Sequence, residues 1–388
     1  MIHMPTSTTR TQITPACFVL ALIGATLVSS ATTAAETQRQ LWVTNAYGDD
    51  IHIFDVSTFK LIRRIEVGPN PHGISATADG KTVHVAIENF GGKSGELIWI
   101  DTASGKITDR IAVGPKPNEN ECTPDGKWIY VPCNDGHYWI VDGEKKTIAK
   151  KIETGGRPHN TTASPDGKRM YLSPMGSPKR VTIVDVAAGH KVIGEIPFTA
   201  AVRPPAISGD EKRFFQNIDG LTGFEVADIA TRKVTHSIKH AIAEDKRSVK
   251  TRCHGLAVRP DQTEIWSCNV EHHVVHIHEL TSGNYKEVAA VKMPGRIYWL
   301  CFTPDSKYCF ASVRSKQQIA VVNCQTREIE RFLDVGREPK RTQVIDVPIR
   351  SEEHTSELQS RRNLVCRLLP EKKKNQPTPL PPPPPPLP

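Results

Sequence analysis

Polar residues recur at one position of a repeated sequence pattern, and their types could bind an anion, hold a metal or transfer protons. In six repeats the polar residue stands seven residues before an aspartate of a tight turn. In the seventh repeat it stands near the C-terminal end of the repeated pattern. In chain order they are His72, Asn118, His159, Arg203, His254, Tyr298 and Lys340 or Arg341. A position that only supported packing would carry Val, Ala or Ile in some of seven copies. We therefore expect a ring of hydrogen-bonding side chains.

Further polar residues stand next to this ring in the sequence or in loops that face it: Glu88, Asn89, Glu119, Asn160, Arg252 and Arg314. Arginine side chains bind anions through charge-assisted hydrogen bonds, whereas carboxylates and imidazoles are the groups that general acid-base catalysis uses. The expected site is thus polar and mixed in charge. It suits a small polar or anionic ligand, or the loop of a partner protein.

Three members of the ring are histidines, so a metal is an alternative. His72, His159 and His254 occupy equivalent positions in non-adjacent repeats, and three imidazoles with one open position could bind a metal such as zinc. No compact HExxH or CxxC motif accompanies them. We expect no cofactor, with a divalent metal or a haem as the alternative.

Other chemical signatures are few. The chain has no GxSxG elbow, Walker loop, dinucleotide GxGxxG motif, CxxCH motif or EF-hand loop. In the run EHHVVHIHE, His276 and His278 alternate along a strand, where we expect a partly exposed sheet surface. Cys253 and Cys268 are the best candidates for a disulfide, because a hairpin would place them diagonally.

The elements that must position these residues are short strands in a sevenfold repeat. Seven strands end in a carboxylate or an amide, at intervals of 41 to 51 residues: Asp55, Asp101, Asp142, Asp185, Asp228, Glu279 and Asn323. This period is typical of four-stranded propeller blades, which bury their faces by stacking around a ring. The sequence predicts an all-β, seven-bladed propeller whose crossovers and loops surround a central channel.

The order of the strands also predicts how the ring closes. The first segment, 41–45, matches the second strand of a blade, whereas the last, 341–347, matches a first strand. A C-terminal strand that pairs into the N-terminal blade would cover two exposed strand edges.

The repeats resemble a known family. The segments LWVTN, IHIFDVST and IEVGPNPHGISATADGK closely resemble the YVTN-type propeller repeat, over residues 38–348. The resemblance implies a seven-bladed fold and an exported or surface protein. Lactonase-type propellers and the haem d1 domain are similar more distantly, and fold alone does not imply a function.

Both ends of the chain differ from the repeats. Residues 1–35 have a basic residue, an apolar core and small residues before Glu36, which is the pattern of a secretory signal peptide. The apolar core is too short to span a membrane. Residues 350–388 begin RSEEHTSELQS, which is the translation of a common sequencing adapter, and end in a proline run. We therefore interpret the tail as an artefact and 36–349 as the propeller, located in the periplasm or secreted.

Composition excludes some partners. A formal charge of +8 over 388 residues, without a basic run interleaved with aromatic residues, gives no reason to expect nucleic acid. We expect a monomer. The leading hypothesis is an exported propeller that binds a ligand at the channel mouth. The alternative is a periplasmic enzyme, lactonase-like or with a metal or haem, that uses the channel His and Glu residues.

Overall fold

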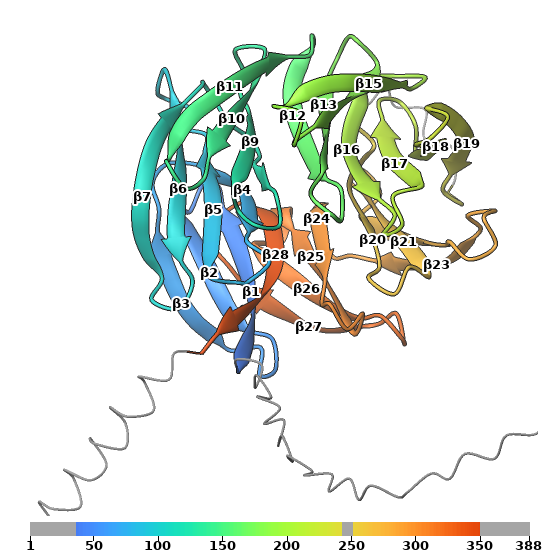
Figure 1. Cartoon of the computed structure of the whole chain (residues 1–388). Coiled ribbons are helices and arrows are strands. Elements are labelled where there is room, and N and C mark those ends of the chain that lie inside the picture. The colour runs from blue at the N-terminus through green and yellow to red at the C-terminus, as the bar shows by residue number, and fades with distance from the viewer. Residues whose placement is uncertain (1–35, 243–250, 350–388) are drawn as a thin grey trace, which may run out of the picture. The chain divides into compact units, whose positions relative to one another are not determined.

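The computed structural model of the chain describes residues 36–242 and 251–349. These residues form seven antiparallel sheets of four strands each and one 3-10 helix, η1 (Arg314–Lys316). The predicted seven-bladed propeller is therefore confirmed (Figure 1). The predicted signal peptide and C-terminal tail lie outside the described residues. In the described part of the chain, no helix is long and apolar enough to cross a bilayer.

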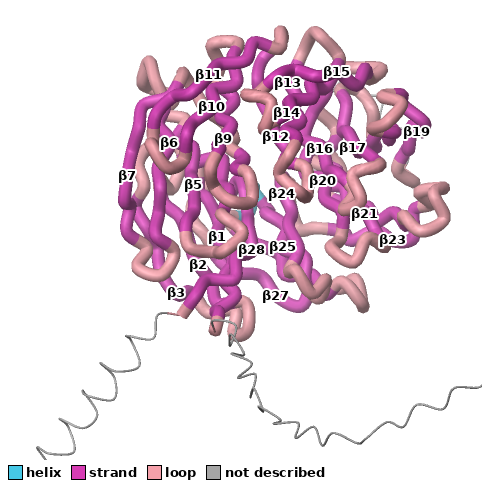
Figure 2. The backbone as a smooth tube through the Cα atoms, viewed as in Figure 1, coloured by secondary structure: helices cyan, strands magenta, loops and turns pink. Residues whose placement is uncertain are grey.

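Each blade runs from an inner strand near the ring centre to an outer strand at the rim, as Figures 1 and 2 show. The inner strands of blades one to seven are β28 (Pro339–Pro348), β4 (Pro71–Ala76), β8 (Glu121–Cys122), β12 (Arg157–Ala163), β16 (Val202–Ile207), β20 (Cys253–Val258) and β24 (Ile297–Phe302). The second strands are β1 (Thr37–Asn45), β5 (Thr82–Ile87), β9 (Trp128–Pro132), β13 (Arg169–Met175), β17 (Arg213–Ile218), β21 (Glu264–Asn269) and β25 (Tyr308–Val313).

The third strands are β2 (Asp50–Asp55), β6 (Gly95–Asp101), β10 (His137–Asp142), β14 (Arg180–Asp185), β18 (Gly223–Asp228), β22 (Val274–Glu279) and β26 (Gln318–Asn323). The outer strands are β3 (Leu61–Glu66), β7 (Lys106–Val113), β11 (Thr147–Glu153), β15 (Lys191–Pro197), β19 (Lys233–Lys239), β23 (Glu287–Lys292) and β27 (Ile329–Asp334).

The ring closes in the first blade, as the strand order predicts. The C-terminal strand β28 pairs antiparallel with β1, from Thr37 opposite Pro348 to Asn45 opposite Pro339. One irregularity interrupts the register between Val43 and Asn45. Because β28 is the inner strand of blade one, its first residues lie beside those of β24 and β4 at the centre of the ring.

The recurring aspartate turns join the first and second strands and are scaffold. Asp79 Oδ1 accepts hydrogen bonds from Thr77 Oγ1 (2.7 Å) and from the Lys81 backbone N–H (3.1 Å). Gly80 then adopts a φ of +67°, and a Cβ there would lie 2.0 Å from the Asp346 carbonyl oxygen. Only glycine meets both conditions. The aspartate therefore shapes the turn.

Apolar side chains fill the space between neighbouring blades. One cluster joins Trp42 and Ile53 of blade one to Val83 and Ile98 of blade two, all of them almost fully buried. Each blade thus buries both faces against its neighbours, which no single sheet could do alone. This rigid ring holds the starts of the inner strands in fixed positions around the channel.

Candidate functional site

Side chains from non-adjacent blades meet at the centre of the ring. Arg341, on β28 of blade one, forms an ion pair with Glu119, which lies two residues before β8 of blade three; Nη1 and Oε1 are 2.9 Å apart. The rings of His159 on β12 and His254 on β20 lie 6.1 Å apart. Blades one and three, and blades four and six, do not adjoin in the ring. These contacts therefore extend across the channel and bring together residues of the predicted ring.

Glu119 connects the ion pair to blade four. Its Oε2 accepts hydrogen bonds from Asn160 Nδ2 (3.0 Å) and from the Thr161 backbone N–H (2.6 Å). Asn160 Oδ1 is in turn hydrogen-bonded to His159 Nδ1. Burial raises the pKa of Glu119 to about 7, although Arg341 opposes that rise. A buried carboxyl group that titrates near neutrality thus lies in the channel.

Two aromatic rings of β24 support three cationic side chains, Arg314, Lys340 and Arg341, which we call the cationic cluster. The Arg341 guanidinium lies 3.5 Å from the Trp299 ring centre. Lys340 Nζ and the Arg314 guanidinium lie 4.6 and 5.3 Å from the Tyr298 ring centre. Cations are attracted to the faces of aromatic rings, most strongly where water is excluded. Lys340 and Arg341 are 9% and 4% exposed, so they are largely shielded from water.

His254 occupies part of the same aromatic surface. Its ring stacks on Tyr298 at 3.8 Å, and its Nδ1 lies 3.1 Å from the Tyr298 carbonyl oxygen, which accepts a hydrogen bond from it. Burial lowers the pKa of His254 well below its ordinary value, and the neighbouring His159 and Arg341 lower it further. His254 is therefore a neutral donor at physiological pH.

The carboxylates near the cationic cluster do not neutralise it fully. Glu338 Oε1 forms an ion pair with Arg314, and Lys340 Nζ lies 3.7 Å from the same oxygen. Glu88 Oε2 lies 3.0 Å from His72 Nδ1. Burial raises the pKa of Glu88 to about 7 and lowers the pKa of Lys340 to about 8. Lys340 thus shares its nearest carboxylate with Arg314.

Three of the remaining predicted residues, Arg203, Asn89 and Arg252, form polar contacts with groups outside this network. Arg203 Nε forms an ion pair with Asp219 (2.5 Å) and lies close enough to lower the pKa of His159. Asn89 donates to the Ser94 carbonyl oxygen (3.2 Å) and so stabilises its own loop. Arg252 Nη1 lies 3.5 Å from Thr222 Oγ1. For Asn89, a structural role is thus the better description.

The alignment of the repeats predicts that Asn118, like the other ring residues, begins the inner strand of its blade, and for Asn118 this prediction is wrong. Strand β8 has only two residues and begins at Glu121, so Asn118 lies in the preceding crossover. The short strand leaves the backbone before Glu121 irregular, and this places Glu119 where it reaches Arg341.

Sequence reasoning missed Trp299, Glu121 and Glu338. Of the three, Glu121 is the one that the repeat pattern could have revealed. Burial and the charge of Glu119 raise its pKa to about 8. At the equivalent register the other inner strands carry Ser75, Thr162, Ala206, Ala257, Cys301 and Gln343. A carboxylate at a position that is otherwise small or neutral was a signal available in the sequence.

The charges of these channel residues favour the binding of an anion over the binding of a metal cation. Burial lowers the pKa of His72, His159 and His254 well below the ordinary value, so all three are neutral. Arg341 is close enough to each of them to lower the pKa further, and a divalent cation would feel the same repulsion. Among the residues that the structure describes, no three His, Cys, Asp or Glu side chains are grouped to hold a metal.

Two other expectations from the sequence are wrong. His276 and His278 are each 1% exposed, because His240 packs over them from blade five; the His240 and His276 rings stack at 4.0 Å. Cys253 and Cys268 are not joined by a disulfide, and both thiols are free and buried. The register pairs Cys253 with Asn269, and burial raises the pKa of both thiols.

Comparisons with known proteins agree with this fold. The model of a family described as "YNCE-like beta-propeller" matches residues 9–350. Periplasmic gluconolactonase from Pseudomonas aeruginosa is 17% identical, with a TM-score of 0.67, and the match covers 80% of this chain and 100% of that one. Hydrazine synthase from Kuenenia stuttgartiensis is 20% identical, with a TM-score of 0.59 and coverage of 72% and 96%.

A third solved structure, dihydro-heme d1 dehydrogenase NirN, is 17% identical, with a TM-score of 0.60 and coverage of 80% of this chain and 66% of that one. The expected likeness to lactonase-type and haem d1-type propellers is therefore confirmed. At such low identity these three structures share the fold alone with this chain. A comparison with curated protein sequences finds no match.

Proposed function

This chain belongs to the YNCE-like β-propeller family, and from that premise we propose that it is an exported propeller whose channel binds a small anionic ligand. The observation that carries the proposal is the position of Lys340. Its ammonium group is almost fully buried, and its nearest carboxylate oxygen is already paired with Arg314. Glu88 also acts on Lys340 electrostatically but forms no ion pair with it within 4 Å, and a buried charge without an unshared ion pair is costly. An anion at this place would supply an unshared partner.

The neighbouring groups suit the same ligand. Arg341 holds its guanidinium against Trp299, and buried cations on aromatic faces are preorganised to form charge-assisted hydrogen bonds. The neutral His72 adds no positive charge, and its Nε2–H can donate to the anion when a protonated Glu88 donates to its Nδ1. The pKa values of Glu88 and Glu119, each about 7, mean that a proton can remove their negative charge when an anion approaches.

Sulfate is a suitable probe, because it remains a dianion across the range in which these groups titrate. In a calorimetric titration near pH 7, sulfate should bind the wild-type protein in a saturable manner. The Lys340→Gln variant should bind it about tenfold more weakly or worse, because a charge-assisted contact is worth roughly 1.5 to 3 kcal/mol.

Lys316→Gln is the matched control for this experiment. It removes the same charge from η1, two residues after Arg314, but from an exposed side chain. It should leave sulfate binding unchanged within about twofold, since exposed charges are screened by salt. Equal losses in both variants, or no saturable binding by the wild type, would exclude the anion site.

A second candidate function is acid-base catalysis on a bound substrate, as in a lactonase-like enzyme. The observation in its favour is that two carboxyl groups with pKa values of about 7, Glu88 and Glu119, lie in the same channel. Hydrolysis of gluconolactone, followed by the release of acid, would test it. A wild-type rate that Glu88→Gln and Glu119→Gln both reduce by about a hundredfold supports catalysis; a rate equal to buffer alone rejects this candidate.

A further inference from the structure

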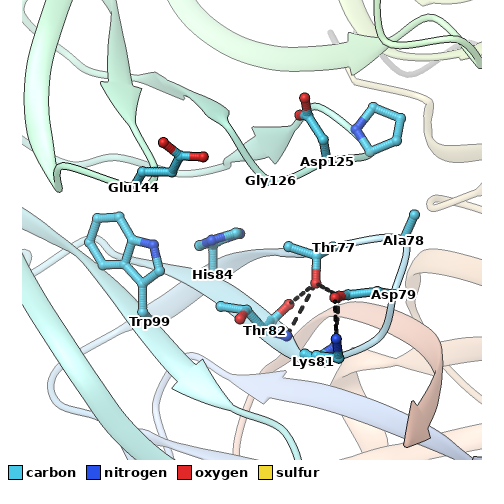
Figure 3. Close-up of a pocket in the computed structure, with 12 residues that line it drawn as sticks. Thr77, Ala78, Asp79, Lys81, Thr82, His84, Trp99, Asp125, Gly126 and Glu144 are labelled. Atoms are coloured by element: carbon cyan, nitrogen blue, oxygen red, sulfur yellow. Dashed lines mark hydrogen bonds and ion pairs between the residues drawn. The ribbon is translucent and has the colours of Figure 1, made fainter.

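A cleft lies between blades two and three, at the end of the ring where the aspartate turns lie. It has a volume of about 430 Å³, within the range of small-molecule sites. Figure 3 shows the rings of His84 and Trp99 on one side of the space, with Asp125 and Glu144 on the other. His84 and Trp99 come from β5 and β6, whereas Asp125 and Glu144 come from turns of blade three.

The cleft exists because blade two departs from the repeat. At the register position of His84, the other six blades carry a large aromatic residue on the second strand: Trp42, Tyr130, Tyr171, Phe215, Trp266 and Phe310. The residues opposite them on the third strand are aliphatic: Ile53, Ile140, Ile183, Val226, Ile277 and Val321. Blade two reverses this order, with the smaller His84 on β5 opposite the large Trp99 on β6.

The reversal also leaves two buried polar atoms without partners. In the other blades the polar rings at this position are satisfied within the protein; Tyr130 Oη, for example, is hydrogen-bonded to His190 Nδ1 (2.6 Å), and Trp266 Nε1 donates to Glu264 (2.9 Å). Trp99 Nε1 and His84 Nδ1 have no hydrogen-bond partner among the described residues, although these residues are only 3% and 1% exposed. Unpaired buried polar groups are uncommon in native proteins.

The charges around the cleft favour a positive ligand. Three carboxylates line it, from Asp79, Asp125 and Glu144, against one ammonium group, that of Lys81. Lys81 lies 3.3 Å from Asp79 and Lys127 lies close to Asp125, so two of the three carboxylates are partly offset, whereas no lysine of the described residues is paired with Glu144. Burial lowers the pKa of His84 to about 3, and its ring therefore adds no positive charge. Because Trp99 Nε1 can only donate a hydrogen bond, the ligand must also carry an acceptor oxygen.

We propose that this cleft binds a small hydroxylated organic cation of the class of an amino sugar. Its ammonium group lies among the carboxylates of Asp79, Asp125 and Glu144, and its hydroxyl oxygens accept from Trp99 Nε1 and pair with the ring of His84. This site does not depend on the anion site proposed in the channel, and the two tests are independent of each other.

Glucosamine and glucose test the proposal, because they differ in the positive charge. Glucosamine should bind the wild-type protein in the low millimolar range and glucose at least about tenfold more weakly, the difference that one charge-assisted contact provides. The double variant His84→Tyr, Trp99→Ile restores the pattern of the other blades and should abolish glucosamine binding. Its melting temperature should equal or exceed that of the wild type, because the cleft is filled.

Two single substitutions test the proposal even if the double variant does not fold as the wild type does. Glu144→Gln removes one carboxylate of the cleft and should weaken glucosamine binding about threefold or more while leaving glucose unaffected. Glu328→Gln makes the same change at an exposed position in the corresponding turn of blade seven, and it should have no effect. Three results would overturn the proposal: no saturable glucosamine binding up to about 10 mM, equal binding of glucose, or an unchanged affinity in Glu144→Gln.

Discussion

Arg341 and Glu119 form a buried ion pair across the propeller channel, although they lie on blades one and three. Arg341 lies on β28, the strand that closes the ring. Glu119 lies just before β8, the shortest of the seven inner strands. Glu119 is also hydrogen-bonded to blade four, and Arg341 packs on Trp299 of blade seven. The pair therefore joins four of the seven blades at the centre of the molecule.

Replacing Arg341 by Met should destabilise the protein by about 3 to 5 kcal/mol at pH 8, because Glu119 loses its partner and must either stay charged while buried or take up a proton from solvent. Denaturant unfolding at pH 8 measures the change. The double variant Arg341→Met, Glu119→Gln removes both charges and should recover more than half of the loss. A single variant as stable as the wild type would show that the ion pair contributes nothing to the fold.

Replacing Glu121 by Gln should stabilise the protein at high pH. The folded pKa of about 8 lies above the ordinary value of 4.5, so the native state holds a proton that the unfolded chain has released. The wild type therefore loses stability as the pH rises through this window. At pH 8.5 the variant should be more stable by about 1 to 3 kcal/mol, a figure reduced for the partial exposure of the side chain.

The same comparison at pH 5 is the control for Glu121→Gln. There the wild-type carboxyl group is largely protonated in the native state and resembles the amide of Gln, so the two proteins should unfold at nearly the same denaturant concentration. A difference in stability that is constant from pH 5 to 8.5 would mean that Glu121 does not titrate in this window.

The fold could be predicted because its signals repeat. The turn aspartates recur for a backbone reason, and seven copies reveal the period even where single copies vary, as with Glu211 in place of the glycine. The position of the closing strand followed from counting strands, and its register with β1 bears this out.

The site could be predicted only in part, because burial and contacts between blades are not periodic. Alignment of the repeats found Arg341 and His254, but it could not show that Glu119 faces Arg341 from two blades away. His276 alternates as an exposed strand residue would, yet His240 of the neighbouring blade covers it. In the cleft between blades two and three, the meaningful signal was a departure from the repeat at His84, which is visible only when the strand register is known.

Removal of the closing strand should open the ring. A chain that ends at Lys340 lacks most of β28, which leaves the edge of β1 exposed and removes Arg341 from the channel. We expect aggregation, because unpaired strand edges associate. A chain that ends at Ile349 retains β28 and should elute as a folded monomer on size-exclusion chromatography. If both chains elute alike as folded monomers, β28 is not needed for closure.

The most direct test of the anion site is the dependence of sulfate affinity on pH. Glu88 and Glu119 should gain protons as the pH falls through about 7, and Lys340 should already be protonated below about 8. The channel thus becomes more positive, and sulfate should bind about tenfold more tightly at pH 6 than at pH 8.5. Calorimetry near pH 7 in two buffers of different ionisation enthalpy should show proton uptake on binding. An affinity that is independent of pH, with no proton uptake, would contradict the account.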